Sequence, residues 1–422
     1  MTLFKACLTG DEPGAASLVS EMVSKSQPSA IWAILMHAAA WNEQRDFDTP
    51  HSTIITHSIH RMIQELGPNP DVLAVKPPTP KLKTPNDLVE PLQKALLERL
   101  ALNLAAIDHW IKDRGPRYNV DTRLDSLDMT MRNYTQSVRK QAHMSALSFA
   151  LRLGSRDDPI RLRRVTASLA AEDADNIGHA FIMPVSLVTE LPQSNYKFPY
   201  QAALWHLTEY LVRKVPRKQP DGFKVDDQME KMASPTSLSK HKNLIATSTV
   251  EYGILGHNGI LAQRIASAAE TGLVHSYTVD WLLDRLKQNV KTKPLTTQQL
   301  SVDKLMKRKL GTDWDQLPSG IDLPNSGKVR LWLVKNATDY WDRMMELKSN
   351  VFEKIIPDIS KKDWPVVRAA QYAMSALNGT PRASHVIIFT QAIWSLAEQG
   401  LIDNSLAALQ VHRMLKQYLK ER

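Results

Sequence analysis

Hydrophobic residues recur every three or four positions along most of the chain, which is the spacing of an amphipathic α-helix. Few stretches alternate hydrophobic and polar residues with the period of two that a half-buried strand requires. Pro159 and Pro365 stand in the first turn of two such segments, where a missing amide hydrogen costs nothing. We therefore predict an all-α fold, with helical spacing at residues 29–44, 88–113, 133–153, 159–174, 242–254, 277–288, 329–356 and 365–377.

Four stretches share a further pattern, in which a histidine comes immediately before the helical spacing. In each of them Ile follows the histidine by three residues, and Ile or Leu follows it by eight. The last two also continue alike, to Gly272-Leu273 and Gly400-Leu401. The four stretches are PHSTIITHSI (50–59), GHAFIMPVSL (178–187), GHNGILAQRI (256–265) and SHVIIFTQAI (384–393).

The spacing of these histidines indicates a tandem duplication. His51 and His179 are 128 residues apart, as are His257 and His385, and a shift of 206 residues places the first pair on the second. The same shift aligns residues 157–187 with 363–393 without a gap. We predict two multi-helical halves related by pseudo-twofold symmetry, residues 1–212 and 238–422. Residues 213–237, rich in Pro, Ser and charge, are expected to form a linker or surface loop.

The charge and the cysteine content narrow the class of protein. The formal net charge is +9, with basic clusters at 152–164, 213–224 and 285–309. No aromatic residues interleave with these charges as a base-stacking surface needs, so solvated helix faces are favoured over nucleic-acid binding. The one cysteine, Cys7, excludes disulfides and thiolate metal sites, and we expect it in a frayed N-terminal region. With no signal peptide or membrane span recognisable, a cytoplasmic protein is expected.

Two interpretations of the histidines stay open. In the first, each imidazole donates to the carbonyl end of a preceding turn and stabilises a corner between helices. In the second, His51, His179, His257 and His385 converge on one pocket between the halves and bind a ligand, a metal ion or haem. The positive end of a helix dipole disfavours imidazolium, and a neutral imidazole suits a metal ligand or a general base.

Local metal-binding motifs are absent from the sequence. Neither H-E-x-x-H nor the E-x-x-H of di-iron bundles occurs, so a metal site would have to be assembled from distant segments. The tryptophans lie on apolar helical faces and are expected in the core; they are Trp32, Trp41, Trp205, Trp281, Trp341 and Trp394.

The stretches GHNGILAQRIASAAETG and SHVIIFTQAIWSLAEQG resemble the histidine motifs at helix starts in the questin oxidase-like family. The resemblance implies an α-helical oxidoreductase that opens a quinone ring by Baeyer–Villiger-type oxidation with NADPH. It carries over only to His257 and His385, as candidate catalytic residues.

Two functions from different classes therefore follow from the sequence. The first is an oxidoreductase or ligand-binding protein with a histidine-lined apolar pocket that accepts an apolar or aromatic small molecule. The second is a non-enzymatic helical scaffold that binds protein or nucleic acid through its basic faces. The histidines at equivalent positions favour the first function.

Overall fold

The structure is a computed structural model. It describes residues 1–23, 25–26, 28–43, 51–66, 86–122, 125–155, 159–173, 176–192, 195–223, 233–306, 323–324, 326–346, 349–377 and 384–418. The central part of the predicted linker, residues 224–232, lies outside these ranges.

The described residues form helices and no strand, which confirms the all-α prediction; one isolated antiparallel bridge joins Asn42 and His109. The first ten helices are α1 (Leu3–Leu8), α2 (Glu12–Val23), α3 (Pro28–Ala40), α4 (His51–Leu66), α5 (Asn86–Ala105), α6 (Leu127–Arg139), α7 (His143–Ser155), α8 (Pro159–Ala171), α9 (His179–Thr189) and α10 (Lys197–Lys214). The others are α11 (Lys242–Val250), α12 (His257–Glu270), α13 (Ser276–Asn289), α14 (Val302–Met306), α15 (Ser326–Met345), α16 (Val351–Ile355), α17 (Trp364–Leu377), α18 (Ser384–Glu398) and α19 (Asn404–Tyr418).

Three of the predicted helices depart most from their expected bounds. The segment 133–153 forms parts of α6 and α7, which are separated where Gln141 adopts a left-handed backbone (φ 59°) and pack against each other. The segment 88–113 is helical only to Ala105, and its remainder folds back to pair with the end of α3 through Trp110 and Trp41. The segment 329–356 is interrupted between α15 and α16.

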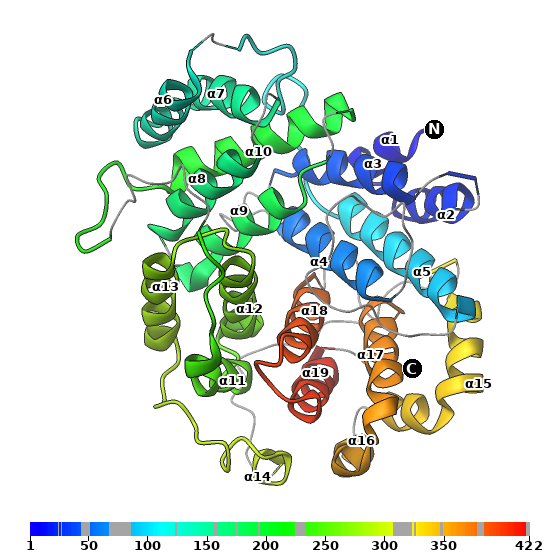
Figure 1. Cartoon of the computed structure of the whole chain (residues 1–422). Helices are drawn as coiled ribbons and strands as arrows, with labels where there is room; N and C mark the ends of the chain where they lie inside the picture. The colour runs from blue at the N-terminus through cyan, green and yellow to red at the C-terminus, as the bar shows by residue number, and fades with distance from the viewer. Residues whose placement is uncertain are drawn as a thin grey trace.

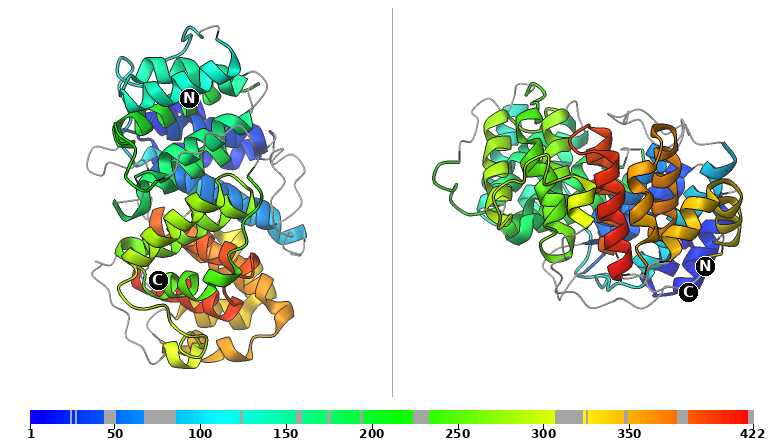
Figure 2. Two further views of the ribbon diagram at one scale, coloured as in Figure 1. Left: turned by 60° about the vertical axis from the view of Figure 1, so that its left-hand side comes forward. Right: turned by 90° about the horizontal axis from the view of Figure 1, so that it is seen from below.

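The helices before residue 224 occupy the upper part of the molecule in Figure 1, and those after residue 233 the lower part. The view from the side shows the same division along the longer dimension (Figure 2). The two groups meet where α9 packs against α12 and where α4 packs against α18. One hydrophobic core runs through both groups.

Four helices close a ring at this junction. α4 packs against α9 and α18, and α12 packs against the same two helices. The last turns of α12 and α18 end in the same hydrogen-bond pattern, in which Leu273 N–H donates to Ala268 O and Leu401 N–H to Leu396 O. This is the Schellman pattern, and it explains the Gly-Leu pairs that follow both helices.

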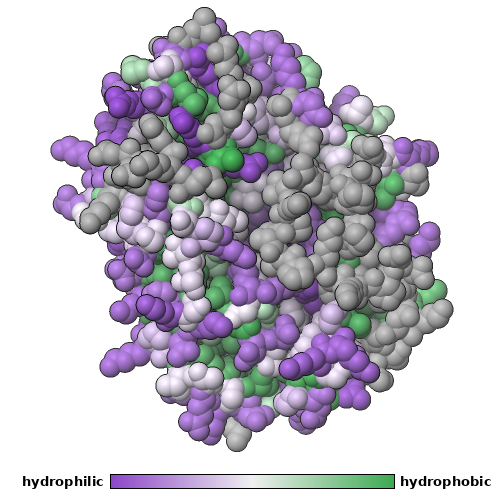
Figure 3. Space-filling model, in the orientation of Figure 1, coloured by the Kyte–Doolittle hydropathy of each residue, from purple (hydrophilic) through white to green (hydrophobic). Residues whose placement is uncertain are grey.

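The tryptophan prediction is also confirmed in the main: five of the six are buried, and Trp281 is half-buried with its Nε1 donating to Ala171 O. On the face shown in Figure 3, hydrophilic side chains predominate and hydrophobic ones form small separate patches. Among the described residues, no helix combines the length and the apolarity needed to cross a bilayer.

Candidate metal centre

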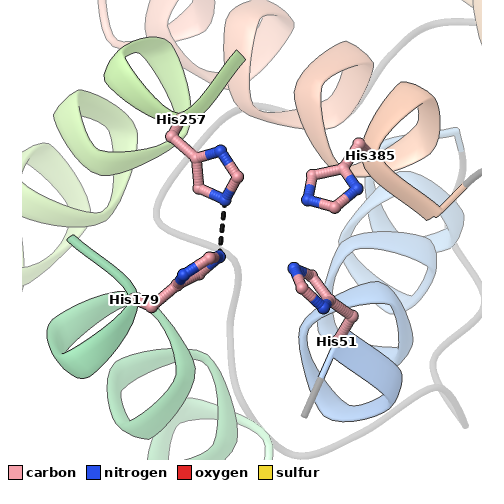
Figure 4. A group of neighbouring side chains, drawn as sticks. All are labelled: His51, His179, His257 and His385. Carbon is pink, nitrogen blue, oxygen red and sulfur yellow. Dashed lines mark hydrogen bonds between the residues drawn. The ribbon is translucent and has the colours of Figure 1, made fainter. Parts of the chain in front are cut away.

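The four histidines predicted to be equivalent meet at one point. His51, His179, His257 and His385 belong to α4, α9, α12 and α18, and each lies at or next to the first residue of its helix. Each offers one ring nitrogen to a group whose members all lie within 4.8 Å of one another. Figure 4 shows the rings at four corners, turned towards a common centre. Within the described residues, no carboxylate belongs to this group.

The rings follow one another in cyclic order. Neighbouring ring centroids are 5.1 Å (His51–His179), 4.3 Å (His179–His257), 5.1 Å (His257–His385) and 4.4 Å (His385–His51) apart. His51 and His257, which stand across the ring, are 6.5 Å apart. A tetrahedral set would have no such opposite pair, so the arrangement is flattened towards a square.

The entry to α9 and the entry to α12 have the same local conformation. Before His179, Ile177 (φ 55°) and Gly178 (φ 85°) are both left-handed, and before His257 the same holds for Leu255 (φ 54°) and Gly256 (φ 80°). At Gly256 a Cβ atom would also lie 2.5 Å from Cδ2 of Phe389. Glycine is required there by both the backbone and the packing, which explains the Gly-His pairs of the sequence.

His257 combines the two interpretations drawn from the sequence. Its Nδ1 donates to the carbonyl of Ile254, the residue that begins the preceding turn, as the corner interpretation expects. Because a carbonyl oxygen can only accept, the proton of the neutral ring is on Nδ1, and Nε2 carries a lone pair towards the other imidazoles. An Nδ1–H bonded to a backbone carbonyl is the usual outer support of a metal-binding histidine.

The other nitrogens of the cluster also face inwards. Nε2 of His179 lies 2.5 Å from Nε2 of His257, so without a third atom between them His179 must donate to His257 (Figure 4). Nε2 of His385 is buried and has no hydrogen-bond partner among the described residues. A buried polar nitrogen without a partner costs free energy, unless a ligand that the structure does not contain satisfies it.

The environment of the cluster disfavours the charged form of His179, His257 and His385. Burial lowers the pKa of His257 to about 4, against the raising effect of its bond to Ile254. Burial, with the neighbouring His257 and His51, lowers the pKa of His179 to about 2. Burial, with the neighbouring His51, His257 and His179, holds the pKa of His385 well below its ordinary value. Neutral imidazole is the form that binds a metal ion.

The donor set fits a first-row transition metal. Metal–nitrogen bonds to imidazole are about 2.0–2.1 Å long. If the four nitrogens form a square whose diagonal is 4.8 Å, the centre of the square lies about 2.4 Å from each nitrogen. If they form a tetrahedron whose edge is 4.8 Å, the centre lies about 2.9 Å from each nitrogen. A planar set therefore needs movements of only a few tenths of an ångström. Imidazole suits zinc, copper, iron and nickel.

A polar layer lies two turns below the histidines. Arg264, 1 % exposed, donates from Nε to Ser186 Oγ (2.9 Å) and from Nη2 to Ser58 Oγ (3.2 Å). Its Nη1 donates to the side-chain oxygens of Gln263 and Gln391. These residues come from all four ring helices, so the layer cross-links them.

A second buried group lies between α4 and the end of α9. The Glu190 carboxylate accepts from Nδ1 of His57 (2.9 Å) and from Nδ1 of His60, and Gln64 contacts Nε2 of His60 at 3.1 Å. Burial alone would raise the pKa of Glu190, but His60 and His57 outweigh it and lower the pKa. Burial, together with Arg264 and against the pull of Glu190, lowers the pKa of His57 to about 3.

Cys7 corrects one expectation. It is not in a frayed segment but fully buried in α1, where burial raises the pKa of its thiol to about 12. A thiol in this environment is protonated at neutral pH and is therefore a poor nucleophile.

Neither a family model, nor a curated protein, nor a solved structure matches this chain. The geometry of the four histidines therefore carries the functional argument.

Proposed function

We propose that the chain is a metalloprotein in which His51, His179, His257 and His385 bind one first-row transition-metal ion. The observation that carries the proposal is the convergence of four imidazoles, with donor atoms within 4.8 Å of one another, at the starts of four packed helices. The lone pair that Nε2 of His257 directs at the other rings supports a metal ion over a ligand that only accepts hydrogen bonds.

The helix dipoles oppose a cation here but do not outweigh the ligands. Each helix N-terminus disfavours a nearby positive charge by about 0.3–1 kcal/mol, or by up to about 2 kcal/mol in a buried setting. Four such ends amount to about 1–8 kcal/mol. Closed zinc sites in small proteins supply about 10–16 kcal/mol of binding free energy. Metal binding therefore remains favourable.

The flattened order of the rings favours a tetragonal ion, such as Cu(II) or Ni(II), over tetrahedral Zn(II). Four imidazole donors in one plane would hold such an ion and would leave it able to bind an exogenous molecule. An open coordination position distinguishes a catalytic site from a structural one.

The activity proposed for such a centre is oxidoreduction. Copper and iron change oxidation state, and the resemblance of the His257 and His385 segments to questin oxidase-like proteins points to the same class of reaction. NADPH and an apolar or aromatic substrate belong to this proposal through that resemblance. When bound, the metal ion would supply the redox chemistry, while the four imidazoles would hold it and exclude water on the buried side.

A tandem duplication accounts for the shared helix starts. Adding 206 to the bounds of α8, residues 159–171, gives 365–377, against Trp364–Leu377 for α17. The same addition to α9 gives 385–395, against Ser384–Glu398 for α18. The match of helix bounds supports a pseudo-twofold relation in which each half contributes two histidines.

The alternative function is a basic helical scaffold. The net charge of +9 and the hydrophilic surface in Figure 3 favour it. Binding to heparin or RNA that weakens steeply with added salt would support it, since neutralised phosphates release counterions.

Metal stoichiometry tests the proposal. The full chain, freed of metal with a chelator and then incubated with Cu(II) or Ni(II), should retain about one ion per chain after desalting. The double substitution His257→Ala, His385→Ala should abolish retention, whereas His241→Ala, at a half-exposed histidine outside the cluster, should not. Equal retention by all three proteins would refute the proposal.

A further inference from the structure

The charge around the cluster points to the ligand that completes the centre. Resting on the proposed function, we infer that the exogenous ligand of the four-histidine metal ion is a small monoanion. Hydroxide, azide and cyanide share this chemistry, as does superoxide.

The donor set contributes no negative charge to the centre. All four donors are imidazoles, and within the described residues no carboxylate reaches the group. A divalent ion held by four neutral ligands keeps both of its positive charges. A buried charge without a neighbouring opposite charge is energetically unfavourable, so a nearby negative charge would stabilise the site.

The helices that carry the histidines all run away from the cluster in the same direction. Arg264 stands seven residues after His257, and its partners Ser58 and Ser186 stand seven residues after His51 and His179. Residues at the same distance in sequence from the three histidines meet in one polar layer. The helices α4, α9 and α12 therefore run parallel to one another, away from the cluster. Gln391, six residues after His385, places α18 in the same register.

Four parallel helices direct four positive dipole ends at the metal position. The charge of Arg264 adds to this field from below. An anion is therefore attracted to the centre both by the metal ion and by the positive field of the protein. A neutral ligand of similar size is stabilised by the metal ion alone.

One side of the cluster is less covered by protein than the other. Nε2 of His385 is buried, points into the cluster and has no hydrogen-bond partner among the described residues. His385 and His51 are partly exposed as whole residues, whereas His179 and His257 are buried. The centre is thus least covered on the side of His51 and His385, and we place the approach of the anion there.

Azide titration of the Cu(II)-loaded full chain tests the inference. Bound azide gives Cu(II) a charge-transfer absorption band that free azide lacks. We expect a saturable band, displaced by cyanide, and no comparable spectral change with neutral pyridine. The variant Ser384→Asp places a carboxylate in the first turn of α18, and Ser384→Asn is its neutral match in size.

We expect Ser384→Asp to raise the azide Kd at least about tenfold relative to Ser384→Asn, because the fixed negative charge of the aspartate repels the azide anion. Both variants should still retain about one Cu(II), which shows that the centre is intact. If copper binds but azide does not, or if pyridine binds as tightly, the inference is wrong while the metal centre stands. If copper does not bind, the proposed function itself fails, and this inference fails with it.

Discussion

The guanidinium of Arg264 donates to the hydroxyl of Ser186, and each residue stands seven positions after the histidine of its own helix. This bond joins α12, which follows the predicted linker, to α9, which precedes it. It fixes the two helices parallel and in register, so that their first residues, His257 and His179, face each other. The polar layer thus determines the geometry of the cluster two turns away.

Arg264→Met should destabilise the fold by about 3–5 kcal/mol. The substitution removes the hydrogen bonds that Arg264 donates to Ser186 and Ser58, together with a buried positive charge near Glu190 and Glu65. Breaking a buried charge network has costs of this size. Urea unfolding measures the change. The control is Arg132→Met at an exposed position of α6, where we expect a change within about 0.5 kcal/mol. Equal effects at both positions would show that the buried layer has no special role.

Gly256→Ala should destabilise the protein by about 2–4 kcal/mol and weaken metal retention. Alanine is strained at φ 80°, and its Cβ would collide with Phe389, whose backbone belongs to α18. Gly400→Ala is the matched control, because Gly400 also has positive φ (65°) but open space around its Cα hydrogen. We expect about 1 kcal/mol there, from backbone strain alone. If Gly400→Ala costs as much, packing at the entry to α12 is not the reason for glycine.

His412→Leu should stabilise the protein, and more so in acid. Both ring nitrogens of His412 are buried without a hydrogen-bond partner among the described residues, and the ring lies 4.8 Å from that of Phe352. Burial, followed by Lys416 and Arg413, lowers the pKa of His412 to about 3. The unfolded chain therefore takes up a proton below pH ~6.5 that the folded chain refuses, and the wild type loses stability as the pH falls towards 3.

The leucine variant has no imidazole at this position and does not lose this stability. Its free energy of unfolding, relative to that of the wild type, should therefore increase by about 1.3 kcal/mol between pH 7 and pH 5.5. Urea midpoints at the two pH values measure it. Leu415→Ala is a control at a buried position without a titratable group. Its stability relative to the wild type should be the same at the two pH values. An advantage for His412→Leu that does not change with pH would contradict the assigned protonation state.

The sequence predicted the parts of the site that depend on local signals. Gly178 and Gly256 mark helix entries because those backbones are left-handed, and the following histidines are found at the first helical positions. The break at Gln141 was missed because neither glycine nor proline stands there. Local pattern is a poor guide where tertiary packing imposes the backbone.

The polar layer around Arg264 could be predicted from the sequence only in part. Ser58, Ser186 and Arg264 occupy the same position of the aligned stretches, two turns after each histidine and on the same helix face. Polar residues at a core-facing position could have been recognised as partners. Glu190 could not, since its contacts with His57 and His60 join residues 133 and 130 positions apart, and neither spacing nor periodicity reports such a pair.

X-ray absorption spectroscopy of the Cu(II)- or Ni(II)-loaded full chain tests the central claim most directly. We predict a first shell dominated by four nitrogen donors at about 2.0–2.1 Å, with the outer-shell scattering of four imidazole rings. Loss of one ring's contribution in His257→Ala would assign the shell to this cluster. A shell of oxygen donors with fewer than three imidazoles, or a spectrum unchanged by His257→Ala, would contradict it.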